Sequence, residues 1–127
     1  MRSQMVNRPL VSVVDDDESI REAIEGLLRS AEISVAVFSS ADEFLHSANR
    51  WTTRCLILDL RMAGMDGLAL HQRLVADGSH YAVIIVTAHG DRETRRRALR
   101  AGALAFLPKP FDGEVLLAVV GSVVRGI

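Results

Sequence analysis

Carboxylates dominate the residues of this sequence that could do chemistry. Asp15 and Asp16 directly follow one apolar run, and Asp59 directly follows another run much later in the chain. Ionised carboxylates that share one cleft repel each other and raise each other's pKa. A hard cation relieves that repulsion, and Mg²⁺ takes one or two carboxylates together with water and phosphate oxygens. The three aspartates therefore indicate a magnesium site if the fold brings them together.

Each of these residues also has an ordinary structural interpretation. Asp17 and Glu18 suit the first turn of a helix, where the macrodipole stabilises acidic side chains. Asp59 taken alone is typical of a turn. Two further candidates, Thr87 and Lys109, are an ordinary β-branched strand end and an ordinary surface lysine when each is taken singly. Together with the carboxylates, however, a hydroxyl and an ammonium would suit a phosphoryl group, whose oxygens need donors and positive charge.

Five short apolar runs alternate with helical patterns along the chain. Near-continuous β-branched runs are typical of strands covered on both faces. In the second run, residues 33–37, larger apolar side chains alternate with smaller side chains, which favours an edge strand with one covered face. Asp17, Ser40 and Gly102 suit helix ends, as an N-cap, the start of a capping box and a C-cap. The predicted strands are 10–14, 33–37, 55–58, 82–86 and 103–107. The predicted helices are 20–31, 40–49, 67–75, 91–101 and 114–125.

This alternation predicts an α/β fold, a doubly wound parallel sheet with helices on both faces. Sites in such sheets form outside the carboxyl ends of the strands. With strands about 4.8 Å apart, the ends of the first, third and fourth strands can surround one small anion. Lys109, on the fifth strand, must lean inward to reach about 10 Å across the edge.

Composition limits the class of protein. The 127 residues, 49% hydrophobic and 24% charged, suit one folded domain over residues 1–127, with residues 1–8 expected to be flexible. A net charge of -1 argues against a dedicated nucleic-acid binder. The chain has a single cysteine, which excludes an intrachain disulfide. Because we see neither a signal peptide nor an apolar run of about 20 residues, we expect no membrane association and a cytoplasmic protein.

Several segments taken as a set resemble the response-regulator receiver domain of two-component signal transduction, over about residues 8–125. The matching segments are VVDDD at 13–17, LILDLRMAGMDG at 56–67, VTA at 86–88, GA at 102–103 and FLPKPF at 106–111. The resemblance implies a flavodoxin-like (βα)5 fold with strand order 2-1-3-4-5.

The resemblance also implies a role for each site residue. Asp59 is the expected phosphoacceptor, taking its phosphoryl group from a sensor histidine kinase or a phosphotransfer protein. The expected cofactor is Mg²⁺, held by Asp16, Asp59 and the backbone carbonyl of Arg61, with Asp15 acting through water. Such a domain is not an enzyme with a separate substrate, because it catalyses only its own phosphorylation and slow dephosphorylation.

Thr87, Ala88, Lys109 and Phe106 match the family's phosphoryl-binding and switch positions, and the Lys109–Pro110 bond is expected to be cis. Phosphorylation would draw Thr87 inward and let Phe106 fill the vacated space. The surface of helix 91–101, strand 103–107 and helix 114–125 would then change, which makes it the expected output surface and the expected face for homodimerisation on phosphorylation.

Arg61 and His89, two residues past Asp59 and Thr87, are predicted to tune the lifetime of the phosphoryl group.

Two other functions stay open at this point. One is a small Mg²⁺-dependent phosphatase of the haloacid-dehalogenase type with Asp15 as nucleophile. The other is a pseudo-receiver that binds partners without being phosphorylated. A role in transcription regulation would require a DNA-binding domain beyond Ile127, because this chain is not expected to bind nucleic acid.

Overall fold

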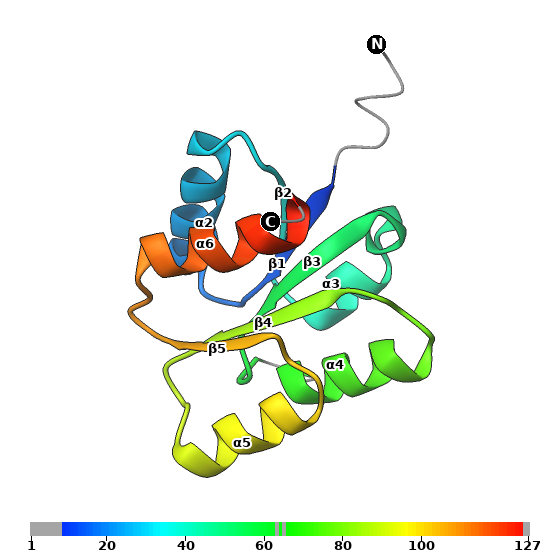
Figure 1. Cartoon of the computed structure of the whole chain (residues 1–127). Coiled ribbons are helices and arrows are strands. Elements are labelled where there is room, and N and C mark those ends of the chain that lie inside the picture. Colours follow the sequence, from blue (N-terminus) through cyan, green and yellow to red (C-terminus); the bar gives the residue numbers. More distant parts are fainter. Residues whose placement is uncertain (1–8, 63, 65, 126–127) are drawn as a thin grey trace.

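The computed structural model describes residues 9–62, 64 and 66–125 and contains one five-stranded parallel sheet (Figure 1). The strand order is β2-β1-β3-β4-β5, which confirms the predicted flavodoxin-like arrangement. The expectation that residues 1–8 are flexible lies outside the described residues. The strands are β1 (Leu10–Val14), β2 (Ser34–Phe38), β3 (Thr53–Leu58), β4 (Ala82–Thr87) and β5 (Ala105–Pro108).

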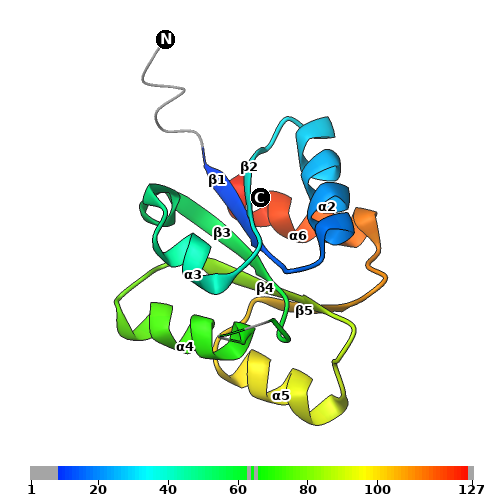
Figure 2. The ribbon, with the colours of Figure 1, turned by 180° about the vertical axis from the view of Figure 1, so that it is seen from behind.

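Helices cover both faces of this sheet. Helices α2 and α6 lie on one face, and α3, α4 and α5 lie on the other (Figures 1 and 2). No helix in the described part of the chain is both long and apolar enough to cross a membrane. The helices are α2 (Glu18–Ser30), α3 (Ala41–Leu45), α4 (Gly67–Ala76), α5 (Arg92–Arg100) and α6 (Gly113–Val124), with a 3-10 helix, η1 (Ala48–Trp51).

Each of the five α-helices begins after a side chain that accepts hydrogen bonds from the backbone N–H groups of its first turn. Such a cap satisfies donors that have no partner within the helix. Asp17 and Ser40 act as the sequence predicted. The complete set of capping residues is Asp17, Ser40, Asp66, Asp91 and Asp112.

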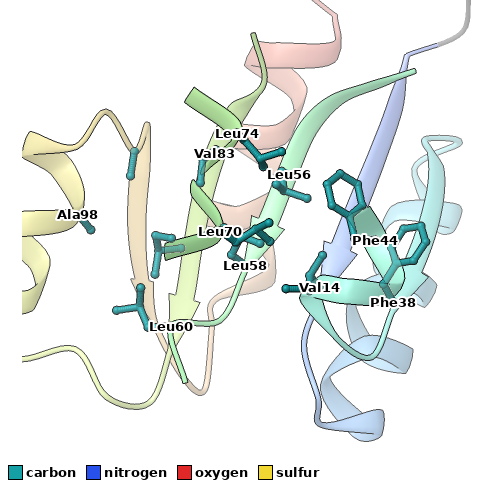
Figure 3. Packing of buried hydrophobic residues seen from close by; sticks show 13 residues of the cluster. Val14, Phe38, Phe44, Leu56, Leu58, Leu60, Leu70, Leu74, Val83 and Ala98 are labelled. Atoms are coloured by element: carbon teal, nitrogen blue, oxygen red, sulfur yellow. The ribbon is translucent and has the colours of Figure 1, made fainter. Parts of the chain in front are cut away.

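Two apolar cores result, because successive residues of a strand point to opposite faces. In Figure 3, Leu56 of β3 points toward Leu74 of α4, and Leu58 points toward Leu70. On the other face, Ile57 packs in the cluster that α2 and α6 cover. Burial on both faces is the physical reason that the strand sequences are almost continuously apolar.

Most predicted boundaries shift by one or two residues, and two of the differences have a clear local cause. The helix expected over 40–49 ends at Leu45, because the Ser47 hydroxyl caps a separate 3-10 turn by accepting from the Asn49 N–H. The strand expected over 103–107 starts only at Ala105. Gly102, with φ of 105°, ends α5, and the following Ala103 N–H still donates back to the Ala98 carbonyl.

Gly67, the first residue of α4, packs directly on the backbone of Asp59. A Cβ added at Gly67 would overlap the Asp59 carbonyl oxygen and lie 2.9 Å from its carbonyl carbon. The Gly67 N–H donates to the Leu60 carbonyl at 2.9 Å, which closes the loop after β3. Only a glycine therefore lets α4 approach the strand end that carries Asp59.

We expect Gly67→Ala to lower the free energy of unfolding by about 1–3 kcal/mol, because backbone atoms cannot move aside as a flexible side chain can. Gly26→Ala in α2 is the matched control, since its Cβ would meet nothing within 4 Å. That control should gain about 0.5–1 kcal/mol from helix propensity. Urea unfolding of both variants measures the difference, and a Gly67→Ala protein as stable as the control would contradict this packing.

Candidate functional site

The carboxyl-terminal edge of the sheet brings together residues from four segments of the chain. Backbone hydrogen bonds continue past the regular strands and fix the residues that follow. The Asp15 N–H donates to the Phe38 carbonyl at 3.1 Å, and the Asp59 N–H donates to the Val14 carbonyl at 3.2 Å. The Lys109 N–H donates to the carbonyl of Thr87 at 3.0 Å. Asp15, Asp59, Thr87 and Lys109 are thus placed by the sheet itself.

The Lys109 ammonium lies between two carboxylates. Its Nζ is 2.8 Å from Asp15 Oδ2 and 2.7 Å from Asp59 Oδ2. Both aspartates are buried, and the lysine is largely covered. The inward lean that the spacing of the strands required is therefore present. Lys109 precedes Pro110 through a cis peptide bond, as the resemblance implied.

Three carboxylates form a cluster at this edge. Asp15, Asp16 and Asp59 each offer one oxygen, and these oxygens lie within 4.8 Å of one another. Asp16 is exposed, whereas the other two are buried. Carboxylate oxygens from neighbouring strand ends, one of them open to solvent, are a donor set that fits Mg²⁺. The Arg61 N–H donates to Asp59 Oδ1 at 3.2 Å, which places the Arg61 backbone beside this cluster.

Burial and hydrogen bonding oppose each other within the site. Burial raises the pKa of Asp15, although the Lys109 ammonium and the Asp17 N–H, 2.9 Å from Oδ1, act to lower it. For Lys109, burial acts to lower the pKa, but its hydrogen bonds to Asp15 and Asp59 outweigh burial and leave the pKa raised. Lys109 is therefore a fixed positive charge at neutral pH.

The candidate switch residues lie next to each other. Thr87 is buried, and its Oγ1 accepts from the His89 N–H at 3.1 Å. Phe106 of β5 is half-buried, and its ring packs against Gly90. A Cβ at Gly90 would lie 2.7 Å from Phe106 Cζ and 3.5 Å from Thr87 Cγ2. Gly90 therefore leaves the space that this ring occupies, a role that its sequence position did not reveal.

Arg61 and His89 both line one surface depression of about 360 Å³, together with Ala88, Gly90 and Asp91. The backbone hydrogen bond from Thr94 is the largest cause that lowers the pKa of Asp91, and the Arg61 charge contributes to the same shift. The structure thus places Arg61, Ala88 and His89 at the rim of the site, where the sequence predicted them. Their roles stay predictions.

Arg21 is a site residue that the sequence did not single out. Its Nη1 donates to the backbone carbonyl of Asp15 at 2.8 Å. This bond joins the first turns of α2 to the end of β1 and fixes the loop that carries Asp15 and Asp16. A basic residue early in the helix that follows an acidic loop was the available signal, but arginines on helix surfaces are too common for it to stand out.

A family model described as the response regulator receiver domain matches residues 11–121. Among curated relatives, the response regulator protein TodT of Pseudomonas putida is 39% identical over 116 residues, 91% of this chain and 51% of that protein. The transcriptional regulatory protein FixJ of Azorhizobium caulinodans is 41% identical over 110 residues, 87% of this chain and 52% of that protein. The chain spans about half the length of these curated relatives.

Solved structures show the same fold. A receiver protein from Pseudoalteromonas atlantica aligns with a TM-score of 0.86 and 29% identity, covering 93% of this chain and 98% of that chain. The crystal structure titled FixJ-N aligns with a TM-score of 0.81 and 30% identity, covering 94% of this chain and 95% of that chain.

The acidic cluster predicts that Mg²⁺ stabilises the fold. At about ten times its Kd, a ligand that binds only the native state adds about 1.4 kcal/mol, which corresponds to a rise of a few degrees in Tm. Thermal unfolding with MgCl₂, against KCl at equal ionic strength, should show this rise. Asp16→Asn should remove it, whereas Asp42→Asn, which changes an exposed aspartate on α3, should retain it. An equal Mg²⁺ effect in Asp16→Asn and the wild type would contradict the metal site.

Proposed function

The chain belongs to the response regulator receiver domain family, and from that membership we propose that Asp59 accepts a phosphoryl group from a phosphohistidine. The donor is a sensor histidine kinase or a phosphotransfer protein of a two-component system. One observation carries the proposal: the Lys109 ammonium, the Asp59 carboxylate and the acidic cluster meet at one edge of the sheet. That arrangement supplies a nucleophile together with positive charge for phosphoryl oxygens.

In the proposed transfer, an oxygen of the Asp59 carboxylate attacks the phosphorus in line with the leaving nitrogen. The new O–P bond forms as the N–P bond of the phosphohistidine breaks, and the histidine ring leaves after taking a proton. Lys109 then pairs with a phosphoryl oxygen, because its ammonium already lies within hydrogen-bond distance of Asp59. The chain acts on no separate substrate and catalyses only its own phosphorylation and slow dephosphorylation.

Asp16, Asp59 and the Arg61 backbone carbonyl would hold Mg²⁺, and Asp15 would contact it through water. The ion, when bound, supplies positive charge that offsets the charge gathering on the phosphoryl oxygens. The hydrogen bonds from Arg21 to the Asp15 carbonyl and from Arg61 to Asp59 keep the two strand ends in place for this task.

The proposed response is a rearrangement around Thr87 and Phe106. A phosphoryl group adds acceptor oxygens beside the Thr87 hydroxyl. When that hydroxyl turns from the His89 N–H toward the new acceptor, the Phe106 ring can leave its place against Gly90. Local phosphorylation thereby shifts an existing equilibrium of the surface formed by α5, β5 and α6. That surface is the proposed output and homodimerisation face.

The proposed cellular location and the proposed role of the whole protein follow from the family and its named relatives. A receiver domain that takes its phosphoryl group from a kinase's histidine works in the cytoplasm, and we propose that location. The relative named FixJ is a transcriptional regulatory protein. A role of the whole protein in transcription regulation is the corresponding proposal for this chain.

The experiment that tests the proposed function is intact mass after incubation with acetyl phosphate and Mg²⁺. We expect one labile adduct of phosphoryl mass on the wild type, no adduct without Mg²⁺, and no adduct on Asp59→Asn. Asp15→Asn serves as the comparison. An adduct that survives Asp59→Asn but is lost in Asp15→Asn would favour the phosphatase mechanism, and a wild type that binds Mg²⁺ but is not labelled by donor or kinase would indicate a pseudo-receiver.

We further propose that Arg61 and His89 tune the lifetime of the phosphoryl group, because both line the depression beside Thr87. Arg61→Asn and His89→Ala should each change the dephosphorylation rate by a factor of about three to ten, or roughly 0.7–1.4 kcal/mol in the barrier. Decay of the adduct measured by mass gives the rate. Arg100→Gln, which removes an exposed charge further along α5, is the control and should decay as the wild type does. Unchanged rates in both site variants would exclude this role.

A further inference from the structure

A second polar surface lies at the opposite end of the sheet from Asp59. The segments that lead into β3 and β4 lie together there, on the right of Figure 1. They enclose a depression of about 350 Å³, whose lining includes Trp51, Arg54, His80 and Tyr81. None of these residues takes part in the proposed phosphoryl transfer, so the surface needs a separate explanation.

Trp51 is exposed over 75% of its surface although it is the only tryptophan in the chain. One contact nevertheless orients its ring. The Arg50 guanidinium carbon lies 4.5 Å from the centroid of the Trp51 ring, a cation–π arrangement. Arg50 itself is buried and is held by Asp77, 3.3 Å away, and by the Tyr81 hydroxyl, which donates to the Arg50 carbonyl. A pre-positioned indole loses little side-chain entropy when a partner covers it.

The surroundings of Trp51 carry a positive excess. Asp77 is the only acidic residue found among the described residues that line the depression, and it is already shared by Arg50 and Arg73. Arg54 and His80 are exposed at the same depression. This local excess contrasts with the net charge of -1 of the whole chain. Tryptophan, tyrosine and arginine are also the residues that contribute most strongly at protein interfaces.

We propose that this surface, defined by Trp51, Arg54, His80 and Tyr81, binds an acidic segment of a partner protein. An apolar side chain of that segment covers the Trp51 indole, and its flanking carboxylates pair with Arg54 and His80. Arginine suits a carboxylate because its planar fork can donate two hydrogen bonds at once. A nucleic acid fits less well, since the depression offers one exposed indole rather than a row of stacking residues and the chain lacks a basic excess.

The proposal is independent of phosphoryl transfer, because the surface and Asp59 lie at opposite ends of the strands. An acidic partner could therefore stay bound while the kinase acts on Asp59. Asp59→Asn should bind the acidic segment as the wild type does, so that a failure of either proposal leaves the other intact.

Trp51 fluorescence provides a direct test, because no other tryptophan contributes. The probe is the blocked peptide acetyl-Glu-Glu-Leu-Glu-Glu-amide, titrated into the whole chain. We expect a saturable blue shift as the indole is covered, with amide signals of residues 50–54 and 77–81 moving in the same titration. Arg54→Gln should weaken the binding about tenfold, which corresponds to the loss of one charge-assisted contact.

Three controls separate this surface from general attraction between charges. Arg29→Gln, which removes an exposed arginine of α2 that does not line the depression, should bind as the wild type does. A peptide with lysine in place of glutamate and inorganic phosphate at equal ionic strength should leave the fluorescence unchanged. The proposal is overturned if the acidic peptide gives no saturable shift, if the lysine peptide or phosphate gives the same shift, or if Arg54→Gln and Arg29→Gln bind equally.

Discussion

The structure depends on one electrostatic arrangement, the Lys109 ammonium held between the carboxylates of Asp15 and Asp59. Two buried carboxylates beside each other would be costly without a compensating charge. The lysine supplies that charge from the end of β5 and thereby joins the ends of three strands. In the proposed phosphoryl transfer, the ammonium that pairs with both carboxylates would also pair with the added phosphoryl group.

The surrounding fold fixes the positions of the strand ends that carry these side chains. Both faces of the sheet are covered, and the ladder hydrogen bonds continue to Asp15, Asp59 and Lys109. Gly67 allows α4 to rest on the Asp59 backbone, and Arg21 ties α2 to the Asp15 carbonyl. A nucleophile and its charge partners need this precision, since misplacement of reacting groups by about 1 Å can cost about two orders of magnitude in rate.

The packing around Thr87 allows a second arrangement of the Thr87 and Phe106 side chains. The Thr87 hydroxyl oxygen accepts from the His89 N–H, and the Phe106 ring rests where Gly90 lacks a side chain. In the proposed response, the hydroxyl donates its proton to a new acceptor on Asp59, and the ring follows the movement of Thr87. The surface around Trp51 lies at the other end of the strands, so that phosphoryl chemistry and a docking contact can use separate parts of one small domain.

The sequence alone determined the parallel sheet, and the family resemblance added the order of its strands. The sequence also determined that Asp15, Asp59, Thr87 and Lys109 meet, because the strand ends of a parallel sheet share one edge. Local signals also placed the caps at Asp17 and Ser40 correctly. The helix over 40–49 was wrong, since a serine at 47 ends it early and starts a 3-10 turn. Only the tertiary structure decided the contacts of Gly90 with Phe106 and of Arg50 with Asp77, because each joins segments that are distant in the chain and carry no local pattern. The contact of Gly67 with Asp59 lies within one short segment, but only the packing of α4 on the strand end shows it.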